Sequence, residues 1–249
     1  KATGKPLATY LGGSLDPIPA YNSNGLGLTN DLDALAAEAE SLIAEGDFNM
    51  AKVRLGRDTL EQDIAAFRAV RAAVGDDILL PVDFNQGLDL DEALKRGKAL
   101  DAENVYWIEE AIAYDNLKGY AQLTAEVNTP NQIGENFHGP MDFSHAIAAK
   151  ACNFTMPDLQ RIGGVTGWLC AMAIAEDADM PMSSHIFPEF SAHVMTVTPT
   201  AHWLEYTSWA NPIIAEPLAV QGGHAIIPDR PGVGLAWDEA AVATYQVDV

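Results

Sequence analysis

The sequence has few cysteines and few basic residues, and it lacks long apolar runs. Cys152 and Cys170 are its two cysteines, so no disulfide framework is indicated. Lys and Arg number 14 against 35 Asp and Glu, which gives a net charge of −21 and a sequence pI near 4.4. A surface of this charge repels phosphate groups, which argues against nucleic-acid and anionic-membrane partners. No stretch approaches the roughly 20 apolar residues of a membrane span, so we expect a soluble, cytoplasmic protein.

What the sequence does contain is typical of a globular protein. Its 249 residues are 48% hydrophobic and include 20 Gly and 14 Pro. This length can bury one sizeable core, either as a single α/β barrel or as two smaller domains. The composition excludes collagen, intrinsic disorder and a disulfide-rich mini-protein.

Short apolar, β-branched segments alternate with amphipathic segments of helical period, which is typical of βα units. Eight strands with intervening helices favour a parallel TIM-type (β/α)7β barrel, although strand count alone leaves an open doubly wound sheet as an alternative. We expect strands at Ile18–Ser23, Asn49–Leu55, Ile78–Asn85, Val105–Glu110, Asn131–Glu135, Asn153–Asp158, Pro181–His185 and His202–Glu205. We expect helices at Asp31–Ala44, Thr59–Ala73, Asp91–Leu100, Leu117–Glu126, Asp142–Ala149, Gly167–Ala175 and Glu189–Val197.

The two ends of the chain differ from this repeating pattern. The chain begins at Lys1 rather than Met, and no basic-then-apolar signal pattern follows. We expect residues 1–16 to be a linker remnant of an upstream domain and residues 17–211 to form the barrel. Residues 212–249 carry Pro and Gly punctuation and are expected to pack outside the barrel as a C-terminal extension.

Acidic residues stand at the ends of three successive predicted strands. Asp83, Glu109 and Glu135 follow one another at intervals of 26 residues, one βα unit each. A parallel barrel places such residues side by side on the carboxyl-terminal rim, where barrel active sites lie. Three carboxylates at one mouth repel each other unless a cation lies among them, and all-oxygen ligation favours Mg²⁺, with Mn²⁺ as an alternative. Zn²⁺ is disfavoured because no suitable Cys or His pair is present.

Other strand ends supply charged groups for the same rim. Lys52 and Arg54 are two residues apart, so both point to one side of their strand. His185 ends the seventh strand, and Asp158 ends the sixth, where its carboxylate can orient the imidazole and raise its basicity. Glu205 ends the eighth. The remaining histidines are expected to be structural: His138, His145, His193, His202 and His224.

These segments together resemble the barrel domain of the mandelate racemase group within the enolase superfamily. The resemblance runs in order from about residue 17 to the end. It is carried by Ala51-Lys52-Val53-Arg54, Val82-Asp83-Phe84-Asn85-Gln86, Trp107-Ile108-Glu109-Glu110, Gly134-Glu135-Asn136, Met156-Pro157-Asp158, Ile162-Gly163-Gly164-Val165-Thr166-Gly167-Trp168, Pro181-Met182-Ser183-Ser184-His185, Ala201-His202-Trp203-Leu204-Glu205 and Ile227-Pro228-Asp229.

The resemblance implies a role for each residue of the rim. It implies one Mg²⁺ on the acidic triad named above and His185 paired with Asp158 as a general acid/base. It implies that Glu205 is an acid bonded to a carboxylate oxygen of the substrate. Lys52 would neutralise that carboxylate, Asn85 would lie beside it, and Ser23 resembles the serine that ends the first strand in this family. Members are also expected to form homo-oligomers.

The sequence departs from the racemase pattern at two places. The racemase has Lys-X-Lys where this chain has Lys52-Val53-Arg54, and arginine stays protonated, so it is a poor base and a good anion clamp. The family also carries an N-terminal capping domain before the barrel, which Lys1–Asp16 cannot supply. A cap would have to come from a segment outside this chain.

The sequence therefore predicts a lyase or isomerase that abstracts the α-proton of a small hydroxy-carboxylate through a metal-stabilised enolate. Dehydration of an acid sugar is slightly favoured, because it needs one base, His185, whereas racemisation needs a proton relay on each face. A 2-hydroxy acid racemase or epimerase is the alternative, since the sequence around Glu205 is closer to the racemase. A third reading is an inactive metal-binding barrel subunit without its cap.

Overall fold

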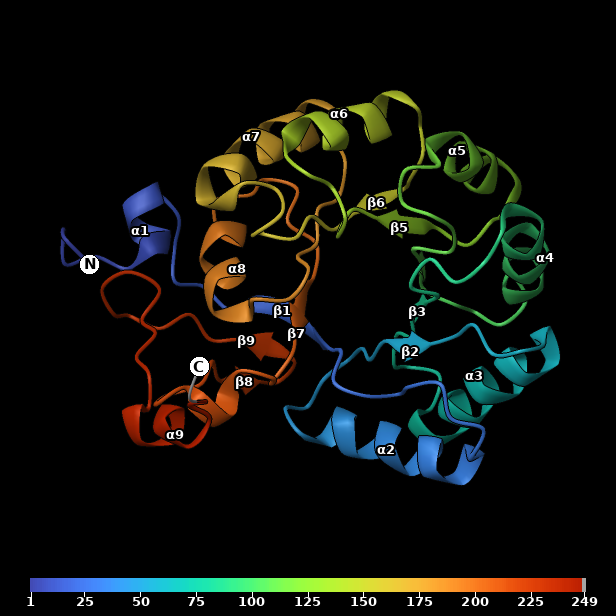
Figure 1. Cartoon of the computed structure of the whole chain (residues 1–249), viewed down its shortest axis with the longest axis horizontal. Helices are drawn as coiled ribbons and strands as arrows, with labels where there is room; N and C mark the ends of the chain where they lie inside the picture. Colours follow the sequence, from blue (N-terminus) through green and yellow to red (C-terminus); the bar gives the residue numbers. More distant parts are fainter. Residues whose placement is uncertain (248–249) are drawn as a thin grey trace.

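A computed structural model describes residues 1–247, in which helices form a ring around a set of strands (Figure 1). The strands are short and alternate with the helices along the chain. The strands are β1 (Ile18–Asn22), β2 (Val53–Arg54), β3 (Val82–Asp83), β4 (Ile108–Glu109), β5 (Asn131–Ile133), β6 (Phe154–Thr155), β7 (Leu204–Tyr206), β8 (Val220–Gln221) and β9 (His224–Ala225). The helices are α1 (Leu7–Leu11), α2 (Leu32–Ala44), α3 (Leu60–Val74), α4 (Leu90–Leu100), α5 (Leu117–Glu126), α6 (Pro140–Ala148), α7 (Gly164–Asp177), α8 (Pro188–Met195), the 3₁₀ turn η1 (Asn211–Ile213) and α9 (Glu239–Thr244).

The strands close into a barrel. β2 to β6 pair in parallel in sequence order, and β1 pairs in parallel with β7. A bridge between Asn22 and Ala51 joins β1 to the segment leading into β2. Met182 forms bridges with Thr155 and with Ala201, which places the segment 181–185 between β6 and β7. This segment occupies the seventh strand position of the barrel. The predicted (β/α)7β barrel is confirmed, and the open sheet is excluded.

The paired strands are shorter than the sequence predicts. β1 to β6 lie inside their predicted ranges, and β7 extends one residue beyond its predicted end, to Tyr206. Residues expected at the ends of the third and fourth strands, Asn85 and Glu110, have φ of 44° and 35°. A positive φ turns the backbone out of the extended conformation, so these strands end earlier. The seventh predicted strand makes single bridges rather than a ladder.

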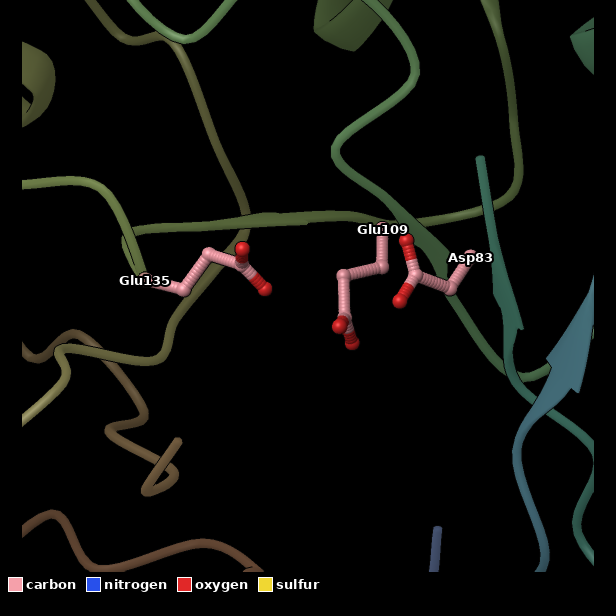
Figure 2. Close-up of side chains that lie close together, drawn as sticks. All are labelled: Asp83, Glu109 and Glu135. Atoms are coloured by element: carbon pink, nitrogen blue, oxygen red, sulfur yellow. The ribbon is translucent and has the colours of Figure 1, made fainter. Parts of the chain in front are cut away.

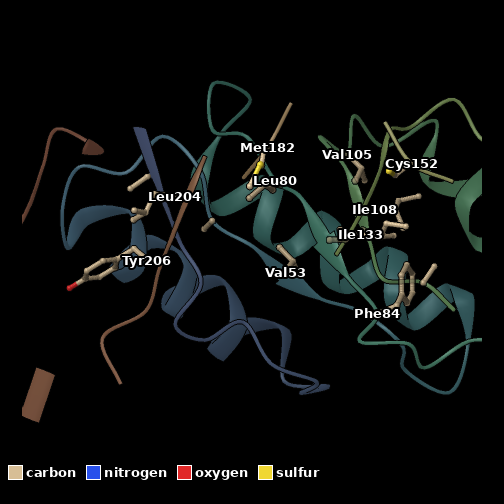
Figure 3. Close-up of a cluster of buried hydrophobic side chains, with 14 of the residues drawn as sticks. Val53, Leu80, Phe84, Val105, Ile108, Ile133, Cys152, Met182, Leu204 and Tyr206 are labelled. Carbon is tan, nitrogen blue, oxygen red and sulfur yellow. The ribbon is translucent and has the colours of Figure 1, made fainter. Parts of the chain in front are cut away.

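Alternate residues of the strands face two different environments. Residues on one side pack against the helices, as Val53, Ile108 and Leu204 do (Figure 3). Those on the other side line the barrel interior, where Tyr21, Met50 and Trp107 form a separate cluster. The interior is aromatic toward the amino-terminal ends of the strands and polar toward their carboxyl-terminal ends. This division follows from the period of two along each strand.

The segments outside the barrel repeat pack against it on one side (Figure 1). The β8–β9 hairpin adds to the edge of β1, with β9 antiparallel to Ile18 and Pro19. Near the N-terminus, α1 lies against α8, where Ala8 is fully buried and its N–H donates to His193 Nδ1 at 3.2 Å. The assignment of residues 1–16 as a linker and the boundary near residue 212 stay predictions. Among residues 1–247, no helix is both long enough and apolar enough to cross a membrane.

A buried ion network fixes the loop that follows β2. Asp63 of α3 is 1% exposed and accepts hydrogen bonds from the backbone N–H groups of Gly56 and Arg57, both at 3.0 Å. Its other oxygen accepts from Arg96 Nη1 at 2.6 Å. Arg57 in turn donates to the carbonyl oxygen of Arg54, at the end of β2, at 3.0 Å.

Replacing Asp63 by Asn is expected to lower the free energy of unfolding by about 3–5 kcal/mol, because it removes the carboxylate that pairs with two buried guanidinium groups, those of Arg57 and Arg96. Denaturant unfolding measures the change. Asp91→Asn, an exposed carboxylate in the first turn of α4, is the matched control and should change stability by less than about 0.5 kcal/mol. Equal effects of the two substitutions would contradict the role of the network.

Candidate active site

Three carboxylates meet at the carboxyl-terminal rim of the barrel. Asp83 ends β3, Glu109 ends β4, and Glu135 lies two residues beyond β5. One oxygen from each lies within 4.8 Å of the others. Figure 2 shows Glu109 between the other two, with the carboxylates of Asp83 and Glu135 directed toward it. The predicted meeting of the three residues is observed.

Strand register and one glycine account for this meeting. Asp83 and Glu109 are direct partners across the β3–β4 ladder, so their side chains leave the sheet at the same level. The partner of Glu109 on β5 is Gln132, not Glu135. Gly134 has φ of 137°, and a Cβ there would lie 3.1 Å from the backbone nitrogen of Met156. The chain can turn at this glycine and bring Glu135 back toward the other acids.

Lys52 contacts three acids from inside the barrel. It lies on the segment leading into β2 and is 2% exposed. Its Nζ forms ion pairs with Glu109, with Glu205 at 2.8 Å and with Asp83 at 3.4 Å. Burial by itself lowers the pKa of Lys52, but the negative charges of these acids outweigh burial and hold the pKa well above its ordinary value. The side chain is therefore a fixed cation.

The acids outnumber this cation. Burial, together with the negative charges of Asp83, Glu205 and Glu135, raises the pKa of Glu109 to about 8 despite the opposing charge of Lys52. Burial also disfavours ionised Glu205, but Lys52 lowers the pKa of Glu205 below its ordinary value. A divalent cation among the triad would relieve this repulsion. The donor set is all oxygen, and Asp83 and Glu109 are at most 1% exposed, so the residues fit a hard ion such as Mg²⁺.

His185 and Asp158 form a hydrogen-bonded pair beside the triad. His185 Nδ1 lies 2.8 Å from Asp158 Oδ2, and the other oxygen of Asp158 accepts from the backbone N–H groups of Gln160 and Arg161. The second imidazole nitrogen, Nε2, lies 3.2 Å from Glu135. Burial disfavours the imidazolium, but the hydrogen bond to Asp158 and nearby acids raise the pKa of His185 to about 9. The pair directs one ring nitrogen toward the cluster.

The other predicted residues lie on the same rim. Arg54 Nη2 donates to Ser23 Oγ at 3.1 Å, and Nη1 lies 3.6 Å from Asp83. Burial opposes the charge of Arg54, but the charges of Asp83, Glu205 and Glu109 together outweigh burial and raise the pKa of Arg54. Asn85 donates through its backbone N–H and its side-chain amide to Asp83, at 2.7 and 3.1 Å. The structure thus brings every predicted site residue to one rim.

Sequence reasoning missed several groups that hold these side chains. The indole of Trp107 and the amide of Gln132 both donate to Glu109 Oε2, at 3.0 and 3.3 Å. The backbone N–H of Ile186 donates to Glu205 Oε2 at 2.8 Å. Trp107 lies two residues before Glu109, so the strand period could have placed it on the same side. No comparable signal exists for the other two, because their contacts cross between strands.

The fold and this rim define the class of protein. The family model described as enolase C-terminal domain-like matches residues 34–241. The chain therefore belongs to this family, in its mandelate racemase and muconate lactonizing enzyme group, as the sequence resemblance implied.

Individual relatives share most of this chain. The L-talarate/galactarate dehydratase of Salmonella typhimurium is 32% identical over 241 residues, which are 97% of this chain and 60% of the relative. The structure of an enolase from alpha proteobacterium bal199 with bound magnesium is 51% identical with a TM-score of 0.97, covering 99% of this chain and 68% of that one. An enolase from Bradyrhizobium, complexed with magnesium and mandelic acid, is 45% identical with a TM-score of 0.94, covering 99% and 67%.

The alignments cover nearly all of this chain but only part of each relative. The chain spans about 60% of the length of the Salmonella dehydratase and about two thirds of the two enolases. Other curated relatives are acid-sugar dehydratases, cycloisomerases and an epimerase. Homologous structures hold magnesium, and the buried acidic triad of this chain could hold a metal ion.

Proposed function

We propose that this chain is the catalytic barrel of a Mg²⁺-dependent enzyme that removes the α-proton of a hydroxy-carboxylate. The observation that carries the proposal is the His185–Asp158 pair, in which the second ring nitrogen, Nε2, lies 3.2 Å from Glu135. A base is thereby held beside a carboxylate triad suited to a divalent cation. Asp83, Glu109 and Glu135 would hold the ion.

The surrounding residues suit the charge that this reaction develops. When bound, Mg²⁺ would supply positive charge near the substrate carboxylate, where negative charge grows as the α-proton leaves. Lys52 adds a second fixed cation at the same place. Lys52 favours the ionised form of Glu205, so Glu205 would donate a hydrogen bond to a carboxylate oxygen of the substrate only after it takes up a proton. Asn85 has an amide beside Asp83.

Dehydration of an acid sugar is the favoured outcome. Its first bond change breaks the α C–H bond and moves the proton to His185 Nε2. The β C–O bond then breaks as the leaving hydroxyl takes the proton back from His185 and departs as water, and the enol rearranges to a 2-keto-3-deoxy acid. This sequence needs one base. Arg54, which is held as a cation between Ser23 and Asp83, cannot serve as a second one.

Racemisation or epimerisation of a 2-hydroxy acid is the second candidate. The Bradyrhizobium relative that binds magnesium and mandelic acid is more similar to this chain, at 45% identity, than the Salmonella dehydratase, at 32%. Racemisation would need a proton donor on the face opposite His185. On that face a water molecule would have to carry the proton, or Arg54 would have to release one, which its raised pKa opposes.

Proton NMR in D₂O with Mg²⁺ and a panel of sugar acids and 2-hydroxy acids tests the proposal. Loss of the α-proton signal with a new keto-acid methylene signal is the expected result and indicates dehydration. Exchange with inversion and no new product would favour the racemase. If the protein bound Mg²⁺ but no compound in the panel exchanged its α-proton for deuterium, the enzyme proposal would be overturned and an inactive subunit would be favoured. A chelator control should abolish all exchange.

A further inference from the structure

Side chains inside the barrel hold the carboxylate of Glu109 on both of its oxygens. Its Oε1 faces Lys52, and its Oε2 accepts two hydrogen bonds, from the indole of Trp107 at 3.0 Å and from the amide of Gln132 at 3.3 Å. Glu109 and Gln132 are both fully buried. A buried amide must use both its donor and its acceptor to avoid a desolvation cost, so the other partners of Gln132 matter.

Those partners form a chain that runs toward the opposite end of the barrel. The hydroxyl of Ser183 donates to Gln132 Oε1 at 3.2 Å, and Ser183 Oγ lies 3.3 Å from His202 Nδ1. His202 Nε2 lies 3.0 Å from the hydroxyl of Tyr106, whose oxygen also accepts from the indole of Trp203 at 3.3 Å. The residues come from four different strands or their leading segments, and they connect the aromatic end of the interior with the acidic rim.

All hydrogen bonds of this series point the same way, so that each group donates to the next one toward Glu109. A carboxylate only accepts, so the amide nitrogen of Gln132 must face Glu109 and its oxygen must face Ser183. Because the hydroxyl proton of Ser183 is then used, His202 must donate from Nδ1 and accept at Nε2 from Tyr106. That pattern requires a neutral imidazole, and burial indeed lowers the pKa of His202 to about 4. Aligned hydrogen bonds of this kind strengthen one another.

We propose that Gln132 is a positioning residue for Glu109, and that Ser183 and His202 fix the amide of Gln132 in the donating orientation. The inference rests on the proposed function, in which Glu109 is a metal ligand. With Oε2 held by two donors and Oε1 by Lys52, the Glu109 carboxylate keeps one orientation beside the other two acids. The consequence is a higher affinity for Mg²⁺ than the three acids would have with a freely rotating Glu109 carboxylate.

The Mg²⁺ affinity of two variants tests this inference. Gln132→Met keeps the length of the side chain and removes its donor, and we expect the dissociation constant for Mg²⁺ to rise about 10-fold or more. His202→Phe interrupts the hydrogen-bond chain three bonds from Glu109 and fits an aromatic surrounding, so we expect a smaller rise in the same direction. Titration calorimetry with Mg²⁺ alone measures both values, and thermal unfolding measures stability in parallel.

Thr155→Val is the matched control. Thr155 is fully buried on the neighbouring strand β6, and its hydroxyl donates to the carbonyl oxygen of Pro181 at 3.2 Å, outside the chain. We expect this variant to keep the wild-type Mg²⁺ affinity even where its melting temperature falls. If Gln132 and His202 had only a structural role, all three variants would be less stable. The loss of Mg²⁺ affinity would then not depend on whether the substituted residue belongs to the hydrogen-bond chain.

Wild-type Mg²⁺ affinity in Gln132→Met would overturn the inference, and so would an equal loss of affinity in Thr155→Val. A wild-type protein that does not bind Mg²⁺ would also overturn it. Failure of the proposed function is a different result. In that case Mg²⁺ binds and Gln132→Met weakens the binding, yet no compound exchanges its α-proton in D₂O.

Discussion

Replacing His185 by Asn is expected to slow α-proton exchange by about 10²–10⁴-fold, the usual contribution of a positioned general base. Asn is close to the size of imidazole and can still reach Asp158, but it has no basic nitrogen to direct at the cluster. The loss should therefore fall on the proton-transfer step. Solvent deuterium exchange followed by proton NMR, with saturating Mg²⁺ and an active substrate, measures the rate.

The matched control for this prediction is His138→Asn, the same change at an exposed histidine. It should leave the exchange rate within about twofold of the wild type. Both variants should also bind Mg²⁺ and unfold at temperatures near that of the wild type. If His185→Asn kept the wild-type exchange rate, the base would have to be another residue and the proposed mechanism would be wrong.

The acidic rim could be predicted from sequence because it depends on a repeating unit. Equal spacing of Asp83, Glu109 and Glu135 places them on adjacent strands of any closed parallel barrel. The structure shows that the third acid does not lie on its strand, since β5 ends at Ile133 and Gly134 turns the chain. The spacing of residues predicts which side chains become neighbours. The backbone conformation at Gly134 determines how the side chain of Glu135 reaches the other two acids.

Contacts between distant strands could not be predicted in the same way. The sequence placed Lys52 near a substrate carboxylate, but its ion pairs with Glu109 and Glu205 depend on which strands become neighbours when the barrel closes. His202 was expected to be structural, without a partner comparable to Asp158. Its bonds to Tyr106 and Ser183 arise from residues 96 and 19 positions away along the chain. Local pattern carries no information about such pairs.

The N-terminal segment contains a helix that the sequence did not predict. The assignment of residues 1–16 as a linker remnant stays a prediction. In the structure, Leu7–Leu11 forms α1, whose first turns are held by contacts with α8 and with the backbone of Gly232. A helix of 5 residues is too short to be stable alone. Its existence therefore depends on surfaces formed by residues nearly 200 positions later.

Replacing Lys52 by Met is expected to lower the free energy of unfolding without Mg²⁺ by about 3–5 kcal/mol, because it removes the cation from a buried group of acids. Lys52 Nζ contacts Glu109, Glu205 and Asp83, and each of these side chains is at most 2% exposed. The carboxylates would then face one another with less compensation. Denaturant unfolding in the presence of a chelator measures the loss.

Added Mg²⁺ should restore more stability to Lys52→Met than it adds to the wild type. An ion among Asp83, Glu109 and Glu135 supplies the missing positive charge, and in the variant it no longer meets the repulsion of the lysine ammonium. Lys95→Met is the control: its side chain is 58% exposed and pairs with Glu92 on the surface of α4, so it should change stability by less than about 0.5 kcal/mol with or without Mg²⁺. Equal gains from Mg²⁺ in wild type and Lys52→Met would mean that lysine and metal do not compete for the same acids, and the metal would then have to bind elsewhere.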